Sequence, residues 1–183
     1  MSFGILLLRV VLGLLMAAHG AQKLFGWFGG RGPSSTAAGF ARLRFRAPLL
    51  MALAAAIAEF AGGLLLAIGL ATPLAALAFV VVMLNAIATT HWQNGFWNTK
   101  RGYEFNLLIL TAAVAIAATG PGRFSLDALI GWSSSISGPW WAVGALALGA
   151  LLSAATLGLG RRSADTSPKG ADENSPSHKP AAG

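Results

Sequence analysis

The sequence predicts an all-α protein, a polytopic bundle of membrane-spanning helices. Of its 183 residues, 55% are hydrophobic and only 10% are charged, which is too apolar for an ordinary soluble domain. Five apolar stretches come close to the roughly 20 residues that a helix needs to cross a bilayer. Because a helix satisfies its backbone groups within one segment and an open sheet does not, all five are predicted as helices.

The five predicted spans cover residues 3–25, 48–70, 73–91, 103–119 and 140–160. Pro48 suits the first turn of the second span, where its missing N–H is not needed. The turn from Gly69 to Pro73 is too short for anything except an antiparallel hairpin between the second and third spans. After Gly160 the composition changes abruptly to Ser, Pro, Lys, Asp and Asn, which predicts a disordered polar tail over residues 161–183.

Charge asymmetry predicts the orientation of the five spans. The connections after the first and third spans and the start of the tail carry most of the basic residues, namely Arg31, Arg42, Arg44, Arg46, Lys100, Arg101, Arg161 and Arg162. The opposite face has only Arg123 in its connections. Basic loops stay in the cytoplasm, so we expect a bacterial inner-membrane protein with its N-terminus outside and its C-terminus in the cytoplasm. Residues 41–47 serve either as this topology signal or as a contact for anionic headgroups.

Composition also excludes several kinds of chemistry. The net charge of +7 does not indicate nucleic-acid binding, because the basic residues lie between apolar spans and in the tail. Without cysteine the chain cannot ligate an iron–sulfur cluster through thiolates. Its histidines show no metal-ligand spacing. His19 and His91 differ in predicted depth by about 10 Å, which disfavours a haem held between them.

Glu59, near the middle of the second span, is the most unusual residue of the sequence. An ionised side chain at the centre of a membrane helix costs roughly 3 kcal/mol, so it usually faces a partner, a cavity or a proton path. Ala54, Ala58 and Gly62 form a stripe of small residues that would let another helix approach closely. Glu59 lies beside this stripe, so we expect it to face protein and not lipid.

Further polar residues suggest two layers inside the bundle. Arg9, His19 and Lys23 fall within an arc of about 80° on the first span. At about 1.5 Å per residue, the depth of Glu59 lies between those of His19 and Arg9, so either basic residue is an expected partner. Near the cytoplasmic end, a second layer is expected to hold Lys23 and two other residues, His91 and Glu104.

These layers leave two interpretations open. One is a proton-linked or quinone-binding cavity, since a quinone head needs hydrogen-bond donors and a proton donor beside an apolar slot. The other is a set of buried ion pairs that fix helix register without chemistry. Asn85 and Asn106 are expected to hydrogen-bond across helices.

The outer connection after the fourth span forms a second candidate motif. Its turn formers and charged residues are Gly120, Pro121, Gly122, Arg123, Ser125 and Asp127. Glycines around a proline end the helix sharply, and Ser125 is predicted to cap a short helical turn. Arg123 and Asp127 would then pair across that turn. The motif is either a structured loop or a gate or docking surface above the bundle.

Together these motifs resemble the DoxX family of bacterial membrane proteins. The matching features span residues 9–127 and are Arg9 with Gly13, His19-Gly20, Lys23-Leu24-Phe25-Gly26, Glu59 with Gly62-Gly63, Leu66 to Gly69, Gly102-Tyr103-Glu104 and the run from Gly120 to Asp127. The resemblance implies a four-helix membrane core, here residues 1–127. Residues 128–160, with the outer connection and the fifth C-terminal span, would lie outside that core.

Some members of that family are linked to quinone-dependent sulfur oxidation or to membrane oxidoreductase assemblies with soluble redox partners. We therefore expect the chain to be a multi-pass membrane subunit or accessory protein of an oxidoreductase system. Quinone is the cofactor that this resemblance implies. The partners compatible with this function are soluble redox proteins, other membrane subunits and further copies of the chain. The alternatives are a small-solute or proton-coupled transporter and a structural assembly factor that docks soluble redox partners.

Overall fold

The computed structural model describes residues 2–161, and these form a helical protein without a β-sheet. The seven α-helices are α1 (Ser2–Leu24), α2 (Gly32–Arg42), α3 (Pro48–Ile68), α4 (Thr72–Ala86), α5 (Glu104–Thr119), α6 (Leu126–Leu129) and α7 (Pro139–Gly160). After α4 the helix continues as a π-helical segment, Ile87–His91, and as a 3₁₀ turn, Trp92–Asn94; a second 3₁₀ turn covers Asn98–Lys100. The predicted disordered tail lies outside the described residues, except for Arg161.

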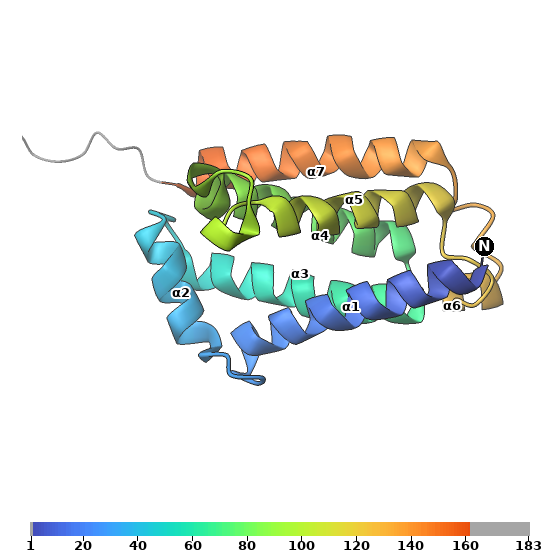
Figure 1. Cartoon of the computed structure of the whole chain (residues 1–183), viewed down its shortest axis with the longest axis horizontal. Helices are drawn as coiled ribbons and strands as arrows, with labels where there is room; N and C mark the ends of the chain where they lie inside the picture. Colours follow the sequence, from blue (N-terminus) through green and yellow to red (C-terminus); the bar gives the residue numbers. More distant parts are fainter. Residues whose placement is uncertain (1, 162–183) are drawn as a thin grey trace, which may run out of the picture.

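Five long helices run along one axis in alternating directions (Figure 1). Within the described residues, α1, α3, α7 and α4 with its continuation to Asn94 are long and apolar enough to cross a membrane. Helix α5 is apolar but has 16 residues, so it extends about 24 Å. The predicted helical membrane bundle is confirmed. Each predicted span agrees with a helix to within two residues at either end, when α4 is taken together with the π-helical segment that follows it.

The two ends of the bundle differ in what covers them (Figure 1). One end, which we call the α2 end, carries α2, the C-terminal end of α1 and the π-helical segment. The other, the α6 end, carries α6 and the N-terminal end of α1. Helix α2 was not predicted, because its 11 residues contain no apolar run of spanning length. It begins with Pro33 in its first turn, where proline is well tolerated.

Helices α1 and α3 approach each other so closely that their backbones touch. A Cβ atom on Gly13 would lie 2.5 Å from the Gly63 carbonyl oxygen, and one on Gly20 would collide with the backbone of Phe60. The stripe of small residues predicted on α3 (Ala54, Ala58 and Gly62) does not make this contact, so the prediction that it seats a neighbouring helix was partly wrong. Gly62 packs against Phe79 of α4, and the other two members face a cavity instead of a neighbouring helix.

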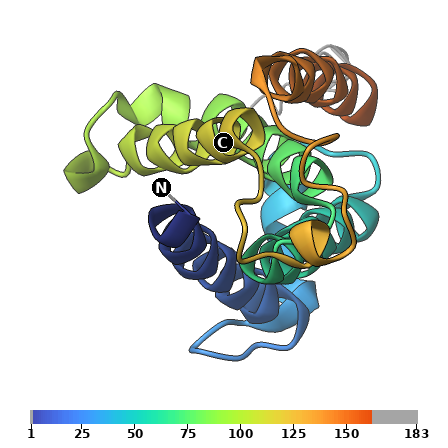
Figure 2. The ribbon, with the colours of Figure 1, turned by 90° about the vertical axis from the view of Figure 1, so that its right-hand side faces the viewer.

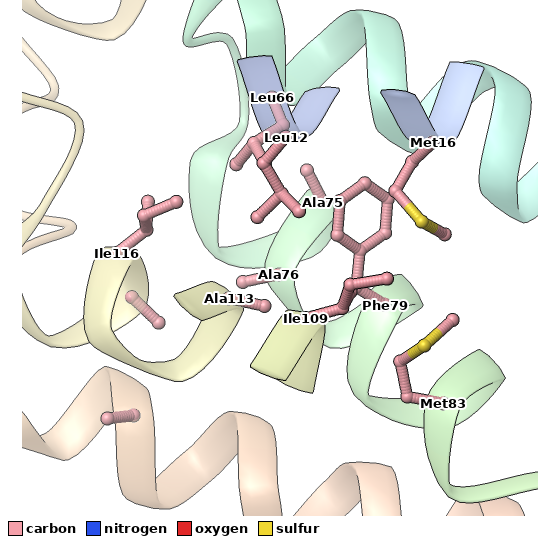
Figure 3. Close-up of a cluster of buried hydrophobic side chains, with 12 residues drawn as sticks. Leu12, Met16, Leu66, Ala75, Ala76, Phe79, Met83, Ile109, Ala113 and Ile116 are labelled. Atoms are coloured by element: carbon pink, nitrogen blue, oxygen red, sulfur yellow. The ribbon is translucent and has the colours of Figure 1, made fainter. Parts of the chain in front are cut away.

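Helix α4 occupies the centre of the bundle, between α3 on one side and α5 and α7 on the other (Figure 2). Phe79 of α4 is fully buried and meets Met16 of α1, Leu66 of α3 and Ile109 of α5 in the apolar core (Figure 3). Large apolar side chains elsewhere stay exposed, Trp140 at 80% and Leu159 at 77%. Lipid would cover such side chains in a membrane.

Candidate functional site

A cavity of about 610 Å³ lies between α2, α3, α4 and α7. This is within the size range of small-molecule sites, which are mainly apolar with a few convergent polar groups. Apolar side chains form most of its wall, including Met51 of α3, Leu77 and Val81 of α4, and Leu152 of α7. The polar residues of the lining are Lys23, Glu59, Asn85, Thr89, Thr90, His91 and Thr156.

Small residues on α3 make room for this cavity. Ala54, Ala55 and Ala58 line it on one side and Ala78 of α4 on another. A side chain longer than a methyl group at any of these positions would project into the space. Ala54 and Ala58 of the predicted stripe thus bound a cavity and do not seat a helix.

Glu59 and Lys23 form an ion pair in the cavity wall. The Lys23 ammonium donates a hydrogen bond to Oε1 of Glu59. The Glu59 side chain is 4% exposed and that of Lys23 34%, so Lys23 reaches inward from the end of α1. The second carboxylate oxygen, Oε2, is buried and has no hydrogen-bond partner among residues 2–161. The prediction that Glu59 faces protein is confirmed.

The π-helical segment supplies the remaining polar groups. Its wider turn places Thr89, Thr90 and His91 in the cavity wall, and π-helical turns occur frequently at functional sites. The Thr89 hydroxyl donates to the Asn85 carbonyl oxygen (2.7 Å), and Nδ1 of His91 donates to the Arg101 carbonyl oxygen (2.8 Å). The threonines were missed at the sequence level, because nothing in the run Ile87–His91 distinguishes a π turn from an α turn.

Both asparagines interact across helices, as predicted. The Ser153 hydroxyl of α7 donates to Oδ1 of Asn85 (2.8 Å). Nδ2 of Asn106 on α5 donates weakly to the Met83 sulfur of α4 (3.5 Å). Of the two, only Asn85 lines the cavity.

Residues at the α2 end close the cavity. Phe40, Leu43 and Phe45 contribute to its lining. Phe45 forms an isolated antiparallel bridge with Arg161, and Nε of Arg161 donates to the Leu43 carbonyl oxygen (3.0 Å). The end of α7 is therefore hydrogen-bonded to the segment that closes the cavity.

The expected pairing of Glu59 with Arg9 or His19 was wrong. The contact of Gly20 with Phe60 places Glu59 near the C-terminal end of α1, and Arg9 lies eleven residues further along, about 16 Å away. His19 is half-buried, and the ion pair with Glu59 is made by Lys23 instead. Depths counted from predicted helix ends missed this register.

Arg9 belongs instead to the α6 end, where it is completely buried. Nη2 of Arg9 donates to the Phe124 carbonyl oxygen. Nε and Nη1 have no hydrogen-bond partner within residues 2–161. The guanidinium group packs directly over Gly69, so that a Cβ atom there would overlap it.

Asp127 is the second fully buried charged residue of the α6 end. Its carboxylate accepts hydrogen bonds from the backbone N–H of Ala71 (2.8 Å) and from the N–H (3.0 Å) and hydroxyl (2.7 Å) of Thr72. It thereby caps α4 from outside. The predicted pair with Arg123 was wrong, because Arg123 is exposed and lies over the Phe124 ring.

The rest of the outer motif forms the turn that was predicted. Gly120 and Gly122 both have positive φ values on either side of Pro121, and α5 ends at Thr119. The Ser125 hydroxyl accepts a hydrogen bond from the Ala128 N–H (3.1 Å), which confirms it as the cap of α6.

The second predicted layer, Lys23, His91 and Glu104, is not a single cluster, because Glu104 lies apart from the other two. Glu104 accepts a hydrogen bond from the Asn98 N–H (2.9 Å) outside the cavity lining. Of the six predicted intramembrane residues, the fold brings together Lys23, Glu59 and His91 and keeps Arg9, His19 and Glu104 apart. No group of three His, Asp or Glu side chains within residues 2–161 is arranged to hold a metal ion.

The fold and the cavity define a class: a polytopic helical membrane protein with a mainly apolar cavity whose wall contains an ion pair. The DoxX family model matches residues 4–92. A relative from Bacillus subtilis (strain 168), named "Putative oxidoreductase CatD", is 32% identical over 70% of this chain and 88% of the relative. The chain therefore belongs to the DoxX family, as its motifs indicated.

A second relative, "Uncharacterized membrane protein Rv3486" of Mycobacterium tuberculosis (strain ATCC 25618 / H37Rv), is 28% identical over 67% of this chain and 78% of its own length. No solved structure matches the chain significantly. The region matched by the family model contains Lys23, Glu59 and His91, three of the polar residues that line the cavity.

Proposed function

We propose that this chain is a membrane subunit or accessory protein of a membrane-associated oxidoreductase system, and that its cavity receives the head of a quinone. The cavity carries the proposal: about 610 Å³ of mainly apolar space is lined by a few polar residues, Lys23, Glu59 and His91 among them. A quinone combines an apolar ring and tail with two polar oxygens, which suits such a lining. Membership of the DoxX family and the oxidoreductase name of one relative support it.

We infer that the α2 end faces the cytoplasm of a bacterial inner membrane. Basic residues gather at this end, and the exposed ones include Arg42, Arg44, Arg46, Lys100 and Arg101. The cytoplasmic side of a membrane protein carries such an excess. A reporter fused after Gly183 should therefore be active in the cytoplasm, and activity outside would overturn the orientation.

Binding of a quinone tests the proposed function directly. We expect the full chain, purified in mild detergent, to carry a quinone in organic extracts and to bind added decylubiquinone. Ala58→Phe fills the cavity and should weaken this binding at least about tenfold, or about 1.4 kcal/mol. Ala61→Phe is the matched control, because Ala61 is exposed on the same helix and does not line the cavity.

Two outcomes would contradict the proposal. Equal binding by the wild type and Ala58→Phe would show that quinone does not occupy the cavity. Proton-driven solute uptake into proteoliposomes, without any bound quinone, would favour a transporter, which also uses polar groups at mid-membrane depth.

A further inference from the structure

The α4 wall of the cavity is polar toward one end of the helix and apolar toward the other. Between Leu74 and Val82, every lining residue of α4 is apolar, and the polar lining residues all lie between Asn85 and His91. At about 1.5 Å per residue, the apolar part extends about 12 Å toward the α6 end. A molecule that fits such a wall has a polar head at one end and a hydrocarbon chain at the other.

The ion pair of Glu59 and Lys23 lies where the two parts of the wall meet. Gly62 of α3 packs beside Ala78 of α4, and Glu59 precedes Gly62 by three residues. Glu59 is therefore about 4.5 Å nearer the α2 end than Ala78. The ion pair and the polar residues of α4 are thus all on the α2 side of Ala78.

The exposed residues of the lining show where the cavity opens. They are Ala54, Leu74, Thr90 and Leu152. Helices α3 and α7 both pack against α4 and make little contact with each other. Leu74 is 60% and Leu152 43% exposed, and large apolar side chains on spanning helices would face lipid. The cavity therefore opens sideways, between α3 and α7, toward the bilayer.

Residues 43–46, between α2 and α3, form a strap across the α2 end of this gap. The Arg46 N–H donates to the Gly160 carbonyl oxygen (2.8 Å), next to the bridge between Phe45 and Arg161. These contacts join the segment before α3 to the end of α7. A molecule that came from the α2 end would have to break them, whereas one that came from the side would not.

We propose that the cavity takes up its quinone from within the bilayer, through the side opening between α3 and α7. The head lies toward the α2 end, and the hydrocarbon tail follows α4 toward Leu74. This inference rests on the proposed function and names its substrate class, quinones with a tail that dissolve in the membrane. The uptake is a binding equilibrium, in which no covalent bond or electron moves.

Photolabelling of the full chain in lipid nanodiscs tests the orientation of the ligand. Two photoreactive forms of decylubiquinone serve as probes, one with an azide on the ring and one with a diazirine at the end of the tail. We expect the ring azide to label peptides within residues 85–91 and the tail diazirine to label residues 74–82. Excess decylubiquinone should remove both signals.

The labelled positions separate failure of this inference from failure of the proposed function. Competed labelling in the reverse order, or by both probes at the same end of α4, would overturn the orientation and leave a quinone site in place. If decylubiquinone competes with neither probe at the cavity, the proposed function fails, and this inference with it.

A disulfide across the strap tests the route of entry. Residues that face each other in an antiparallel bridge have Cα atoms about 4.5–5.5 Å apart, which a disulfide can span. The chain has no cysteine of its own, so the double variant Phe45→Cys, Arg161→Cys forms a single defined bond.

Side entry predicts that closing this bond does not slow uptake. We expect the ring azide to label the oxidised and the reduced form at the same rate, when the light flash follows mixing after increasing delays. The reduced form of the same protein is the matched control. Labelling that is at least about tenfold slower in the oxidised form would show that the ligand passes the strap, and would overturn side entry.

Discussion

The two ends of the bundle both bury charged side chains but use them differently. At the α6 end, the Asp127 carboxylate accepts three hydrogen bonds from Ala71 and Thr72 at the N-terminal end of α4, whereas Nε and Nη1 of Arg9 have no partner within residues 2–161. At the α2 end, Glu59 lines a cavity of about 610 Å³, accepts a hydrogen bond from Lys23 with one oxygen, and buries the other oxygen without a partner among the described residues. Asp127, whose partners are all protein groups, supports the fold, whereas the ion pair of Glu59 and Lys23 lies in the wall of a cavity.

Loss of Asp127 should have the largest effect on stability. Asp127→Ala leaves two N–H groups and one hydroxyl without their acceptor, at roughly 1–3 kcal/mol each, so we expect a loss of about 3 kcal/mol or more. Equilibrium unfolding in mixed micelles measures it. Protein that stays folded should bind decylubiquinone normally, because the cavity lies elsewhere. A loss below about 1 kcal/mol would show that Asp127 does not clamp the α6 end.

Gly69→Ala should have the next largest effect. Gly69 has a φ of 70°, which costs a residue with a Cβ about 1–2 kcal/mol, and the added methyl group would overlap the Arg9 guanidinium. We expect a loss of about 2 kcal/mol. The loss should shrink in an Arg9→Met background, where a double-mutant cycle isolates the contact.

Gly158→Ala is the control for Gly69→Ala. Gly158 lies in α7 with open space around it, so alanine there should be neutral or slightly stabilising. Identical losses at Gly69 with and without Arg9 would mean that backbone conformation alone is responsible.

Removing the cation of the α2 end should cost less, because Lys23 is partly exposed. Lys23→Met leaves the Glu59 carboxylate buried without its partner, and we expect a loss of about 1–2 kcal/mol. Adding Glu59→Gln removes that charge, so the double variant should return to within about 0.5 kcal/mol of the wild type. A double variant as unstable as Lys23→Met would indicate that packing, and not charge, is lost.

Arg123→Ala should have the smallest effect. Its guanidinium lies on the surface over the Phe124 ring and does not reach Asp127. Exposed substitutions of this kind usually change stability by less than about 0.5 kcal/mol. If unfolding of Arg123→Ala resembled that of Asp127→Ala, the two side chains would act as a pair after all.

The sequence predicted features that depend on local signals. Apolar length located the spanning helices, and Pro48 and Gly69 marked the ends of α3. Because a charge is costly in lipid, Glu59 was predicted to face protein even though its partner was not known. Ser125 capped α6 as expected, because capping involves neighbours only three residues apart.

Pairings between helices could not be predicted in the same way. The partner of Glu59 depends on how α1 slides along α3, and backbone contacts at Gly13 and Gly20 fix that register. Asp127 binds Thr72 across 55 residues of sequence, a choice that no local pattern reveals. Helix α2 was not predicted, because its 11 residues include no long apolar run.

The π-helical segment Ile87–His91 absorbs a change in chain length within the cavity wall. A π turn is an α-helix that holds one extra residue. Deleting a residue from Ile87 or Ala88 would restore the α-helix and leave the residues that follow on their present faces. A deletion elsewhere in α4 would instead rotate those residues by about 100°. In an alignment of homologues, a one-residue gap at this point is therefore compatible with the same arrangement of the residues that follow.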